Sequence, residues 1–172
     1  MIKFRRACVN DAELLAAVRQ KAWASTYRDI YPDEMIDNYD LAAFTARDRA
    51  RLQRPNLTHY LVMDGEQCVG YFSYGAPVYG AWRDFILCLN SLYLLPGYRG
   101  RGLGTRVFVH LREVCAAQKV DKFFCNCNCH NLPAQHFYRK MGGVVTYISD
   151  GHENKAEDQM TFEFYLGESY VN

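Results

Sequence analysis

Alternating and periodic apolar positions divide the chain into short strands and amphipathic helices. Residues 2–8 alternate between apolar and polar side chains, which favours a strand. Leucine, valine and alanine then recur at helical spacing, in a helix that we expect to end near Tyr27. Asn10 followed by Glu13 has the pattern of a capping box at the start of this helix. A second helix is predicted, in pieces, over about 32–52.

Three further apolar segments predict the middle of a sheet. Residues 59–64 and 68–75 have the pattern of two strands joined by Asp64-Gly65, a dipeptide typical of tight hairpins. Residues 85–95 are almost entirely apolar, which predicts a central strand buried on both faces. The proline that follows ends this strand.

The C-terminal half continues the same alternation of strands and helices. A helix with one apolar face follows a glycine-rich stretch, and a strand is predicted at 123–128. Asn131 can cap a short helix that Gly142 closes. Residues 144–149 and 159–166 complete the pattern as a final pair of strands. The order of elements predicts one mixed α/β sandwich of a sheet and its helices.

Composition agrees with a single globular domain over residues 1–172. Hydrophobic residues make up 49% and charged residues 23%, as in ordinary soluble domains. The formal net charge of +1 gives no general reason to expect nucleic acid or an anionic membrane as a partner. No apolar run approaches the ~18 residues of a membrane span. The seven cysteines, an odd number, are simplest to interpret as reduced thiols in the cytoplasm.

The glycine-rich stretch supplies candidate chemistry. Gly100, Gly102 and Gly104 lie at the start of a predicted helix, with Arg99 and Arg101 between and before them. A helix start leaves about four N–H groups unpaired and has a partial positive charge. Glycines leave this backbone uncovered, so the oxygens of a phosphate or pyrophosphate can reach it.

Three other interpretations of this stretch are available. A Walker loop needs a Lys-Ser/Thr pair after its last glycine, whereas Leu103, Gly104 and Thr105 follow here. A dinucleotide fold needs Gly-x-Gly-x-x-Gly and an acidic residue at the end of the next strand, but residues 123–128 end without one. The third interpretation is a turn that only begins a helix. The loop alone does not decide between this turn and a phosphate site.

Its neighbours add a family resemblance. The run Arg99-Gly100-Arg101-Gly102-Leu103-Gly104 resembles the Arg/Gln-x-x-Gly-x-Gly/Ala motif of the GNAT superfamily of N-acetyltransferases. Residues 92–96 look like the strand before that loop, and residues 131–142 resemble the family's Asn-x-x-Ala-x-x-Phe-Tyr-x-x-x-Gly segment. The resemblance implies an α/β (α+β) fold with a mixed, mostly antiparallel sheet of about seven strands and about four flanking helices.

The same resemblance implies acetyl-CoA as the acetyl donor, although it leaves a longer acyl-CoA open. Backbone N–H groups of residues 100–105 would bind the pyrophosphate, and residues 92–94 would line the pantetheine arm and the thioester. Tyr138 would lie near the sulfur and protonate the departing thiolate as general acid. The expected cofactor-binding residues are Leu92, Tyr93, Leu94, Arg99, Gly100, Arg101, Gly102, Leu103, Gly104, Thr105 and Asn131.

The base that would deprotonate the amine is not assigned. Some relatives have a glutamate on the strand before the Asn-x-x-Ala helix, where this chain has Asn126. His130, Asp29 and a chain of waters stay open as alternatives. The substitution at Asn126 also keeps a second class of function open, a non-catalytic acyl-CoA-binding or regulatory domain.

The acceptor is expected to be a small-molecule or peptide amine. An acidic run that includes Asp33, Asp37 and Asp40 is either a solvated face or the border of a pocket for a cationic amine. Many relatives form dimers, so a homodimer is open. Aromatic side chains that could shape a cleft are Trp23, Tyr27, Tyr31, Tyr74, Tyr79 and Trp82.

A metal site is not expected. Cys125, Cys127 and Cys129 alternate along a predicted strand beside His130. Alternate strand residues are ~6.7 Å apart, whereas Zn–S bonds of ~2.3 Å require closer ligands. We therefore interpret them as buried thiols.

Overall fold

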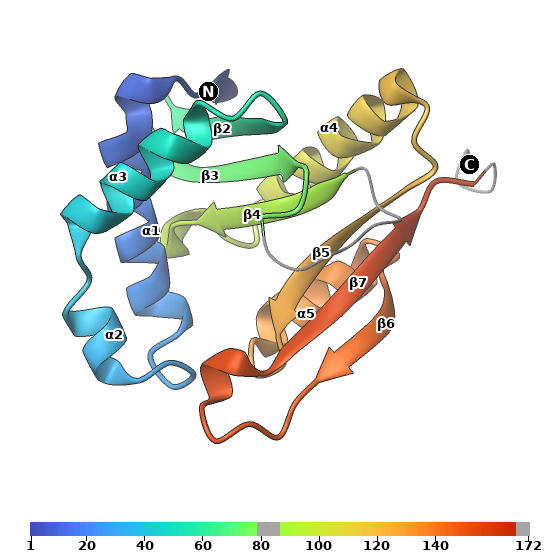
Figure 1. Cartoon of the computed structure of the whole chain (residues 1–172). Helices are drawn as coiled ribbons and strands as arrows, with labels where there is room; N and C mark the ends of the chain where they lie inside the picture. Colours follow the sequence, from blue (N-terminus) through green and yellow to red (C-terminus); the bar gives the residue numbers. More distant parts are fainter. Residues whose placement is uncertain (79–86, 168–172) are drawn as a thin grey trace.

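Seven strands form one mixed sheet in the order β1-β2-β3-β4-β5-β7-β6 (Figure 1). The computed structural model describes residues 1–78 and 87–167. The strands are β1 (Ile2–Arg6), β2 (Leu57–Asp64), β3 (Gln67–Gly75), β4 (Cys88–Leu94), β5 (Lys122–Asn128), β6 (Val144–Ser149) and β7 (Gln159–Tyr165). The helices are α1 (Ala12–Thr26), α2 (Asp33–Asp37), α3 (Leu41–Leu52), α4 (Leu103–Gln118) and α5 (Leu132–Lys140).

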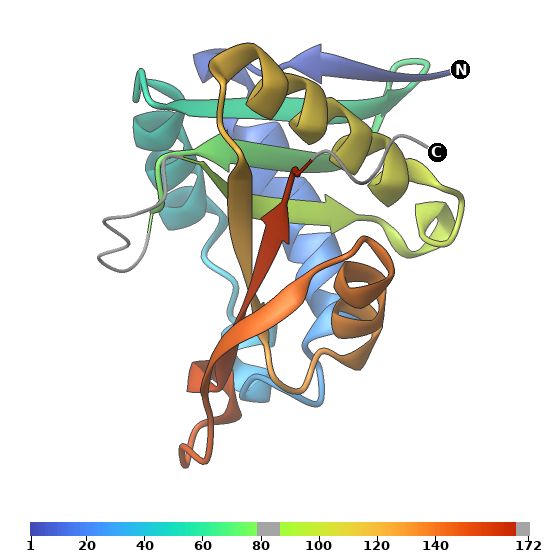
Figure 2. The ribbon, with the colours of Figure 1, turned by 90° about the vertical axis from the view of Figure 1, so that its right-hand side faces the viewer.

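Helices cover both faces of the sheet. α1 and α3 pack on β2 and β3, where Leu15 and Val18 form a buried cluster with Leu61 and Tyr71. α4 and α5 lie on the opposite face (Figure 2). Full burial of each large apolar side chain contributes about 1.5–3 kcal/mol. The cluster on the α4 and α5 side includes Phe72, Phe108, Leu111, Phe123, Phe162 and Phe164.

The expected mixed, mostly antiparallel sheet is confirmed. Within the described ranges, β4 and β5 form its one parallel pair. The predicted hairpin is present, with Gly65 at a φ of +59° between β2 and β3. The described residues form five α-helices rather than about four, because the helix predicted over 32–52 divides into α2 and α3. Asp40 caps α3 by accepting a hydrogen bond from the N–H of Ala43 at 2.9 Å.

The start of α1 differs from its prediction. A single 3₁₀ turn precedes the helix, and Asp11 takes the N-cap position. The Asp11 carboxylate accepts hydrogen bonds from the N–H of Cys8 at 2.8 Å and from both terminal nitrogens of Arg5 at 3.0 and 2.7 Å. The capping box predicted from Asn10 and Glu13 is therefore wrong, because the extra turn moves the cap one residue along the chain.

β4 is shorter and less buried than predicted. Cys88 and Leu89 are buried, but residues 90–94 are only half-buried. The first two residues of the predicted strand lie outside the described residues. The expectation of burial on both faces is wrong for the second half of the strand, because β5 moves away from β4 beyond the pair Cys88 and Phe124.

A buried ion pair joins α1 to α3. Two nitrogens of Arg19 donate to the two carboxylate oxygens of Asp48 at 2.6 and 2.9 Å, and both side chains are almost fully buried. The guanidinium also lies 5.3 Å from the ring centre of Tyr71 and 5.7 Å from that of Phe44. Such a pair is costly to break because the remaining charge stays buried without its partner.

We predict that Asp48→Ala lowers the free energy of unfolding by about 3–5 kcal/mol, because it leaves the Arg19 guanidinium buried and unpaired. Urea denaturation followed by circular dichroism measures this loss. The matched control is Asp37→Ala, which removes an exposed ion pair with Arg28 and should cost no more than about 1 kcal/mol. Equal losses in the two variants would contradict the prediction.

Candidate functional site

β4 and β5 diverge and leave a gap in the middle of the sheet (Figure 1). In the described part of the chain they pair only at Cys88 and Phe124. The N–H of Leu95 donates to the carbonyl of Val69 on the β3 side at 2.9 Å. Successive N–H groups of a strand point to opposite sides, so the N–H of Leu94 points away from β3 and into the gap. This edge can therefore bind a ligand through its backbone.

The residues predicted to line a pantetheine arm lie on this edge. Leu92, Tyr93 and Leu94 pair with β3 on their other side and are half-buried. Asn131 follows β5 on the far side of the gap and caps α5, where its side-chain oxygen accepts from the N–H of Ala134 at 3.2 Å. The predicted cap of α5 is thus confirmed.

The glycine loop enters α4 through two residues in the left-handed region. Gly100 has a φ of +70° and Gly102, the N-cap of α4, a φ of +76°. A Cβ atom built on either residue would have no atom within 4 Å, so the backbone is open on this side. Gly104 has a different role, because a Cβ there would lie 2.7 Å from the ring of Phe137. The loop therefore presents bare N–H groups, and its last glycine lets α5 pack closely.

The two arginines of the loop point to different neighbours. Arg101 stays at the loop, with its guanidinium 5.0 Å from the ring centre of Tyr98 and 3.5 Å from the carbonyl oxygen of Gly97. Arg99 instead reaches the end of α1, where it donates to the hydroxyl oxygens of Ser25 and Thr26, both at 2.9 Å. Of the two arginines predicted at a phosphate site, Arg101 therefore lies at the loop surface, whereas the guanidinium of Arg99 is directed toward α1.

Tyr138 lies on α5 and is buried in the cluster between α4, α5 and the sheet. Its ring packs against Phe108 and Phe162, with ring centres 6.1 and 5.5 Å away. Burial raises the pKa of its hydroxyl well above the usual value, and Cys125 of β5 and Tyr93 of β4 add to the shift. The hydroxyl therefore keeps its proton at neutral pH, which suits a donor and does not suit a base.

A second tyrosine hydroxyl lies near the same place. Tyr27, directly after α1, is buried, and the pKa of its hydroxyl is raised first by burial and then by its neighbours Tyr93 and Tyr31. Burial likewise raises the pKa of the Cys125 thiol, so this sulfur is protonated rather than a thiolate. Tyr27 after α1, Cys125 on β5 and Tyr138 on α5 thus place protonated hydroxyl and thiol groups near the gap.

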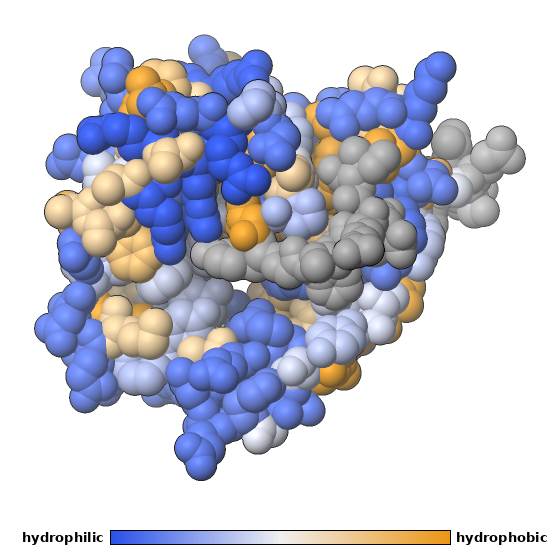
Figure 3. All heavy atoms as spheres, viewed as in Figure 1, coloured by the Kyte–Doolittle hydropathy of each residue, from blue (hydrophilic) through white to orange (hydrophobic). Residues whose placement is uncertain are grey.

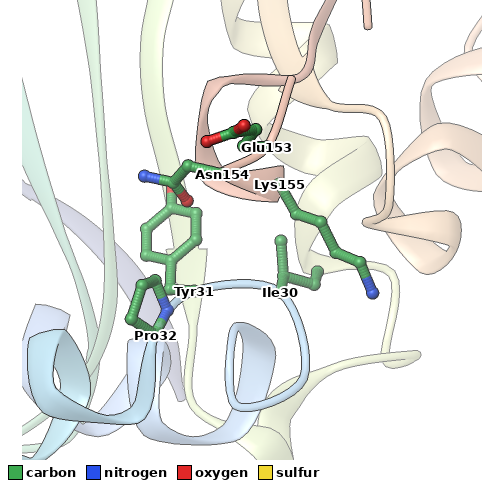
Figure 4. A pocket seen from close by; sticks show the side chains of 6 residues that line it. All are labelled: Ile30, Tyr31, Pro32, Glu153, Asn154 and Lys155. Carbon is green, nitrogen blue, oxygen red and sulfur yellow. The ribbon is translucent and has the colours of Figure 1, made fainter. Parts of the chain in front are cut away.

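An open pocket of about 500 Å³ lies beside the end of α1. Residues 30–32, after α1, face residues 153–155 from the segment between β6 and β7 (Figure 4). The space-filling view shows a hollow between the side formed by α1 and α2 and the side formed by β5 and β7 (Figure 3). Tyr31, Glu153 and Lys155 give the pocket an aromatic surface and one charge of each sign.

The segment between β6 and β7 is held in place by a buried carboxylate. The side-chain oxygens of Asp158 lie 2.6 Å from Nε2 of His130 and 2.7 Å from Nδ1 of His152. These hydrogen bonds, that to His130 first, lower the pKa of Asp158 to about 2. Asn128 adds a bond from its side-chain amide to the carbonyl of Lys155 at 2.7 Å. The end of β5 therefore anchors one wall of the pocket.

The candidates for a base have different surroundings. The side-chain oxygen of Asn126 accepts a hydrogen bond from the hydroxyl of Thr161 at 2.8 Å, an arrangement that only orients the amide. Asp29 lies in the exposed turn after α1. His130 has its orientation set by Asp158. The contact with the carboxylate favours the tautomer whose Nε2 donates to Asp158.

The acidic run is partly neutralised by the chain itself. Arg28 lies 3.3 Å from Asp33 and 2.7 Å from Asp37, and all three side chains are exposed. Asp40 is used as the cap of α3. A cationic ligand at this face would therefore meet carboxylates that already have a cationic partner.

The predicted aromatic residues have several roles. Trp23 lies at the centre of a packed cluster, with ring centres of Tyr27, Tyr31, Tyr39 and Phe44 between 5.5 and 5.9 Å away. Other predicted members are Tyr74, which is buried in the core, and Tyr79 and Trp82, which lie outside the described residues.

Residues 1–78 and 87–167 contain neither a candidate metal site nor a membrane-spanning helix. No group of three or more His, Cys, Asp and Glu side chains there is arranged to hold a metal ion. The prediction of buried thiols is confirmed for Cys125 and Cys127 and wrong for Cys129, which is only partly buried in the turn after β5. Among the same residues, no helix has the length and apolar character needed to cross a membrane.

Sequence reasoning missed the contacts that assemble this site. Arg99 bonds to Ser25 and Thr26, which are 74 and 73 positions away in the sequence. The histidine partners of Asp158 are 28 and 6 positions away. The histidines and Asp158 have no common spacing, so no periodic pattern indicates them. The wall at residues 153–155 lies in a polar stretch that resembles any surface loop.

Comparison with known proteins agrees with this geometry. The family model described as the acetyltransferase (GNAT) family matches residues 16–143. The thialysine N-epsilon-acetyltransferase of Mus musculus is 29% identical over 87 residues, which are 51% of each chain. The match thus spans about half the length of this curated relative.

Solved structures share the fold over almost the whole chain. PaiA N-acetyltransferase from Thermoplasma acidophilum, solved in complex with coenzyme A, has a TM-score of 0.73 at 18% identity and covers 96% of this chain and 99% of its own. The ribosomal-protein-S18-alanine N-acetyltransferase from Escherichia coli has a TM-score of 0.70 at 15% identity. This match covers 100% of this chain and 98% of the other. At these identities the similarity shows a common fold.

The Asp158 contacts predict a dependence of stability on pH. A carboxyl with a pKa of 3.8 when unfolded and about 2 when folded stabilises the fold above pH 4, and this contribution is lost as the pH falls from about 4 to 2. Asp158→Asn should therefore reduce the acid-induced loss of stability in that interval, measured from urea midpoints. The double variant His130→Ala/His152→Ala removes both imidazole partners of Asp158 instead and should have the same effect. A wild-type pH dependence in both variants would exclude this role.

Proposed function

The chain belongs to the GNAT family of acetyltransferases, and on this premise we propose that it transfers the acetyl group of acetyl-CoA to a primary amine, with Tyr138 as general acid. The observation that supports this most directly is the gap between β4 and β5. The glycine loop lies at the end of β4, and the protonated Tyr138 hydroxyl is next to Tyr93 and Cys125 of the two strands. A nucleotide held at the loop can extend its acyl arm along β4 toward this hydroxyl.

Binding of the cofactor would rest on backbone groups. The N–H groups at the start of α4 and the positive end of its dipole attract a pyrophosphate, and Arg101 adds charge beside them. The bare backbone at Gly100 and Gly102 permits close approach of the phosphate oxygens. Residues 92–94 would then align the pantetheine arm through the free edge of β4.

The proposed reaction is direct attack of a neutral amine on the thioester carbonyl. The C–N bond forms and the C–S bond breaks, the Tyr138 hydroxyl gives its proton to the departing sulfur, and the attacking nitrogen releases one proton to solvent. Solvent then returns a proton to the tyrosine. Holding amine and thioester side by side contributes up to about 7–11 kcal/mol in ideal cases.

The carbonyl oxygen gains negative charge during this attack. The N–H of Leu94 points into the gap and is our candidate to stabilise it. A fixed donor of this kind contributes about 3–4 kcal/mol in well-studied enzymes. An alkyl ammonium has a pKa near ~10.4, so the acceptor must release a proton before it can attack.

The acceptor would enter through the pocket between residues 30–32 and 153–155. Its aromatic surface and its two opposite charges suit a small amine with polar groups of its own. The name of the mouse relative indicates one such amine, thialysine, and this supports including it in a first panel. An alanine-terminated peptide represents the alternative class of acceptor.

Release of free CoA thiol tests the proposal. The purified protein is incubated with acetyl-CoA and a panel of amines, and thiol is measured with a chromogenic disulfide. Amine-dependent thiol release supports the proposal. Binding of acetyl-CoA without turnover on any amine would instead favour a non-catalytic acyl-CoA-binding or regulatory domain.

In the same assay we predict that Tyr138→Phe lowers kcat about 10²-fold, since it removes the proton donor and keeps the ring. The KM for acetyl-CoA should change little.

Because the pKa of Tyr138 is raised by burial, wild-type activity should not fall through tyrosine ionisation up to pH 10. The conservative control Tyr147→Phe alters an exposed hydroxyl on β6 and should retain wild-type kcat. Wild-type turnover of Tyr138→Phe would rule out its role.

A second prediction separates backbone strain from ligand contact. Gly100→Ala should lower stability by about 1 kcal/mol because of its positive φ. It should also weaken binding of coenzyme A at least about tenfold, since loss of one charge-assisted hydrogen bond costs about 1.5–3 kcal/mol. Gly65→Ala is the matched control, because Gly65 has a φ of +59° and is equally open but lies in the β2–β3 hairpin. Calorimetry should show wild-type affinity for the control, and equal weakening in both variants would contradict the prediction.

A further inference from the structure

Arg99 connects three parts of the molecule. It lies in the glycine loop, its Nε donates to the carbonyl of Leu94 at the end of β4 at 2.9 Å, and one terminal nitrogen donates to Ser25 and Thr26 at the end of α1. The same nitrogen lies 3.5 Å from the carbonyl oxygen of Ala22. The guanidinium therefore crosses from the expected cofactor loop to the helix on the opposite face of the sheet.

The end of α1 is well suited to hold this cation. The last carbonyls of a helix lack intrahelical partners and have a partial negative charge, which favours a guanidinium. Ser25 and Thr26 donate their own hydroxyl protons to the carbonyl of Ala22 at 2.9 and 2.7 Å. Their oxygens are thereby oriented to accept from Arg99. A planar guanidinium can bond to β4 and α1 at once, whereas the single ammonium of lysine cannot.

The residues that follow this end of α1 form the acceptor side of the site. The N–H of Tyr27 donates to Trp23, and the N–H groups of Ile30 and Tyr31 donate to the carbonyl of Tyr27 at 3.0 and 2.8 Å. Tyr27 has its hydroxyl next to Tyr93, and residues 30–32 line the pocket. Movement of the last turn of α1 would therefore move the pocket wall.

We infer that Arg99 is a positioning residue that couples occupancy of the cofactor loop to order in the acceptor wall. The inference rests on the proposed binding of CoA at the loop. A pyrophosphate fixes the glycine loop, the loop fixes Arg99, and Arg99 fixes the last turn of α1 and residues 27–32. By linkage, order at the acceptor wall also favours cofactor binding. Arg99 thus acts on the acceptor through Ser25 and Thr26 and does not contact either substrate.

Hydrogen exchange with free coenzyme A as the probe tests this coupling without knowledge of the acceptor. In the wild-type protein, saturating coenzyme A should slow exchange of the amides in residues 97–106 and, at least about fivefold, in residues 22–31. In Arg99→Ala the effect at 97–106 should persist and the effect at 22–31 should be lost. The double variant Ser25→Ala/Thr26→Val leaves Arg99 in place, should give the same loss, and provides the test if Arg99→Ala does not fold.

Arg101→Ala is the matched control. It removes the same charge from the same loop but not the contact with α1. The Arg101→Ala protein should therefore need more coenzyme A for saturation, and saturating coenzyme A should still slow amide exchange in residues 22–31. With an acceptor from the amine panel, Arg99→Ala should raise the acceptor KM at least about fivefold with a smaller change in kcat, and Arg99→Lys should recover little of it.

The possible outcomes separate the coupling through Arg99 from the proposed cofactor site. The coupling would be overturned if coenzyme A slowed amide exchange in residues 22–31 of Arg99→Ala or Ser25→Ala/Thr26→Val as much as it does in the wild type. A lower melting temperature in these variants with an unchanged response to coenzyme A would also overturn it, because that is the result for a residue that only stabilises the fold. No slowing at 97–106 in the wild-type protein would instead refute the proposed cofactor site itself.

Discussion

The divergence of β4 and β5 is the constraint on which the rest of the site depends. A sheet that continued its pairing would satisfy every strand edge internally, and it would leave no backbone for a ligand. Here the parallel pairing recorded at Cys88 and Phe124 is followed by separation, so the second half of β4 keeps an open edge. α1 and α3 cover the half formed by β2 and β3, α5 packs on the other half, and α4 packs against strands of both halves and so joins them.

The chemistry around the gap follows from burial of neutral hydroxyl and thiol groups. Removing such groups from water disfavours their charged forms, so Tyr138, Tyr27 and Cys125 keep their protons. Groups of this kind can donate hydrogen bonds and protons but are poor bases. In the reaction proposed above, such groups would assist departure of the leaving group and would not deprotonate the incoming amine. His130, oriented by Asp158, lies at the end of β5.

Local patterns predicted the elements that local chemistry determines. The Asp64-Gly65 hairpin, the cap at Asn131 and the closure of α5 at Gly142 each depend on a few adjacent residues, and all three are present. The cap at Asn10 was wrong because hydrogen bonds from Arg5 to Asp11, six residues further along the chain, favour a different turn. Burial of the second half of β4 was wrong because an apolar sequence does not show how far a neighbouring strand stays paired with it. Motifs located the glycine loop and Tyr138, whereas long-range partners such as Ser25, Thr26 and Asp158 left no trace in spacing.

The ion pairs of Arg28 with Asp33 and Asp37 give the outer face of α2 a built-in competitor. An incoming ammonium can reach those carboxylates only by displacing a guanidinium that is tethered a few residues away and present at a high effective concentration. A monocation exchanges one exposed contact for another and gains almost nothing. A dication can replace Arg28 with one charge while it makes a new contact with the other. The tethered arginine therefore disfavours binding of monocations at the face of α2 that presents Asp33 and Asp37.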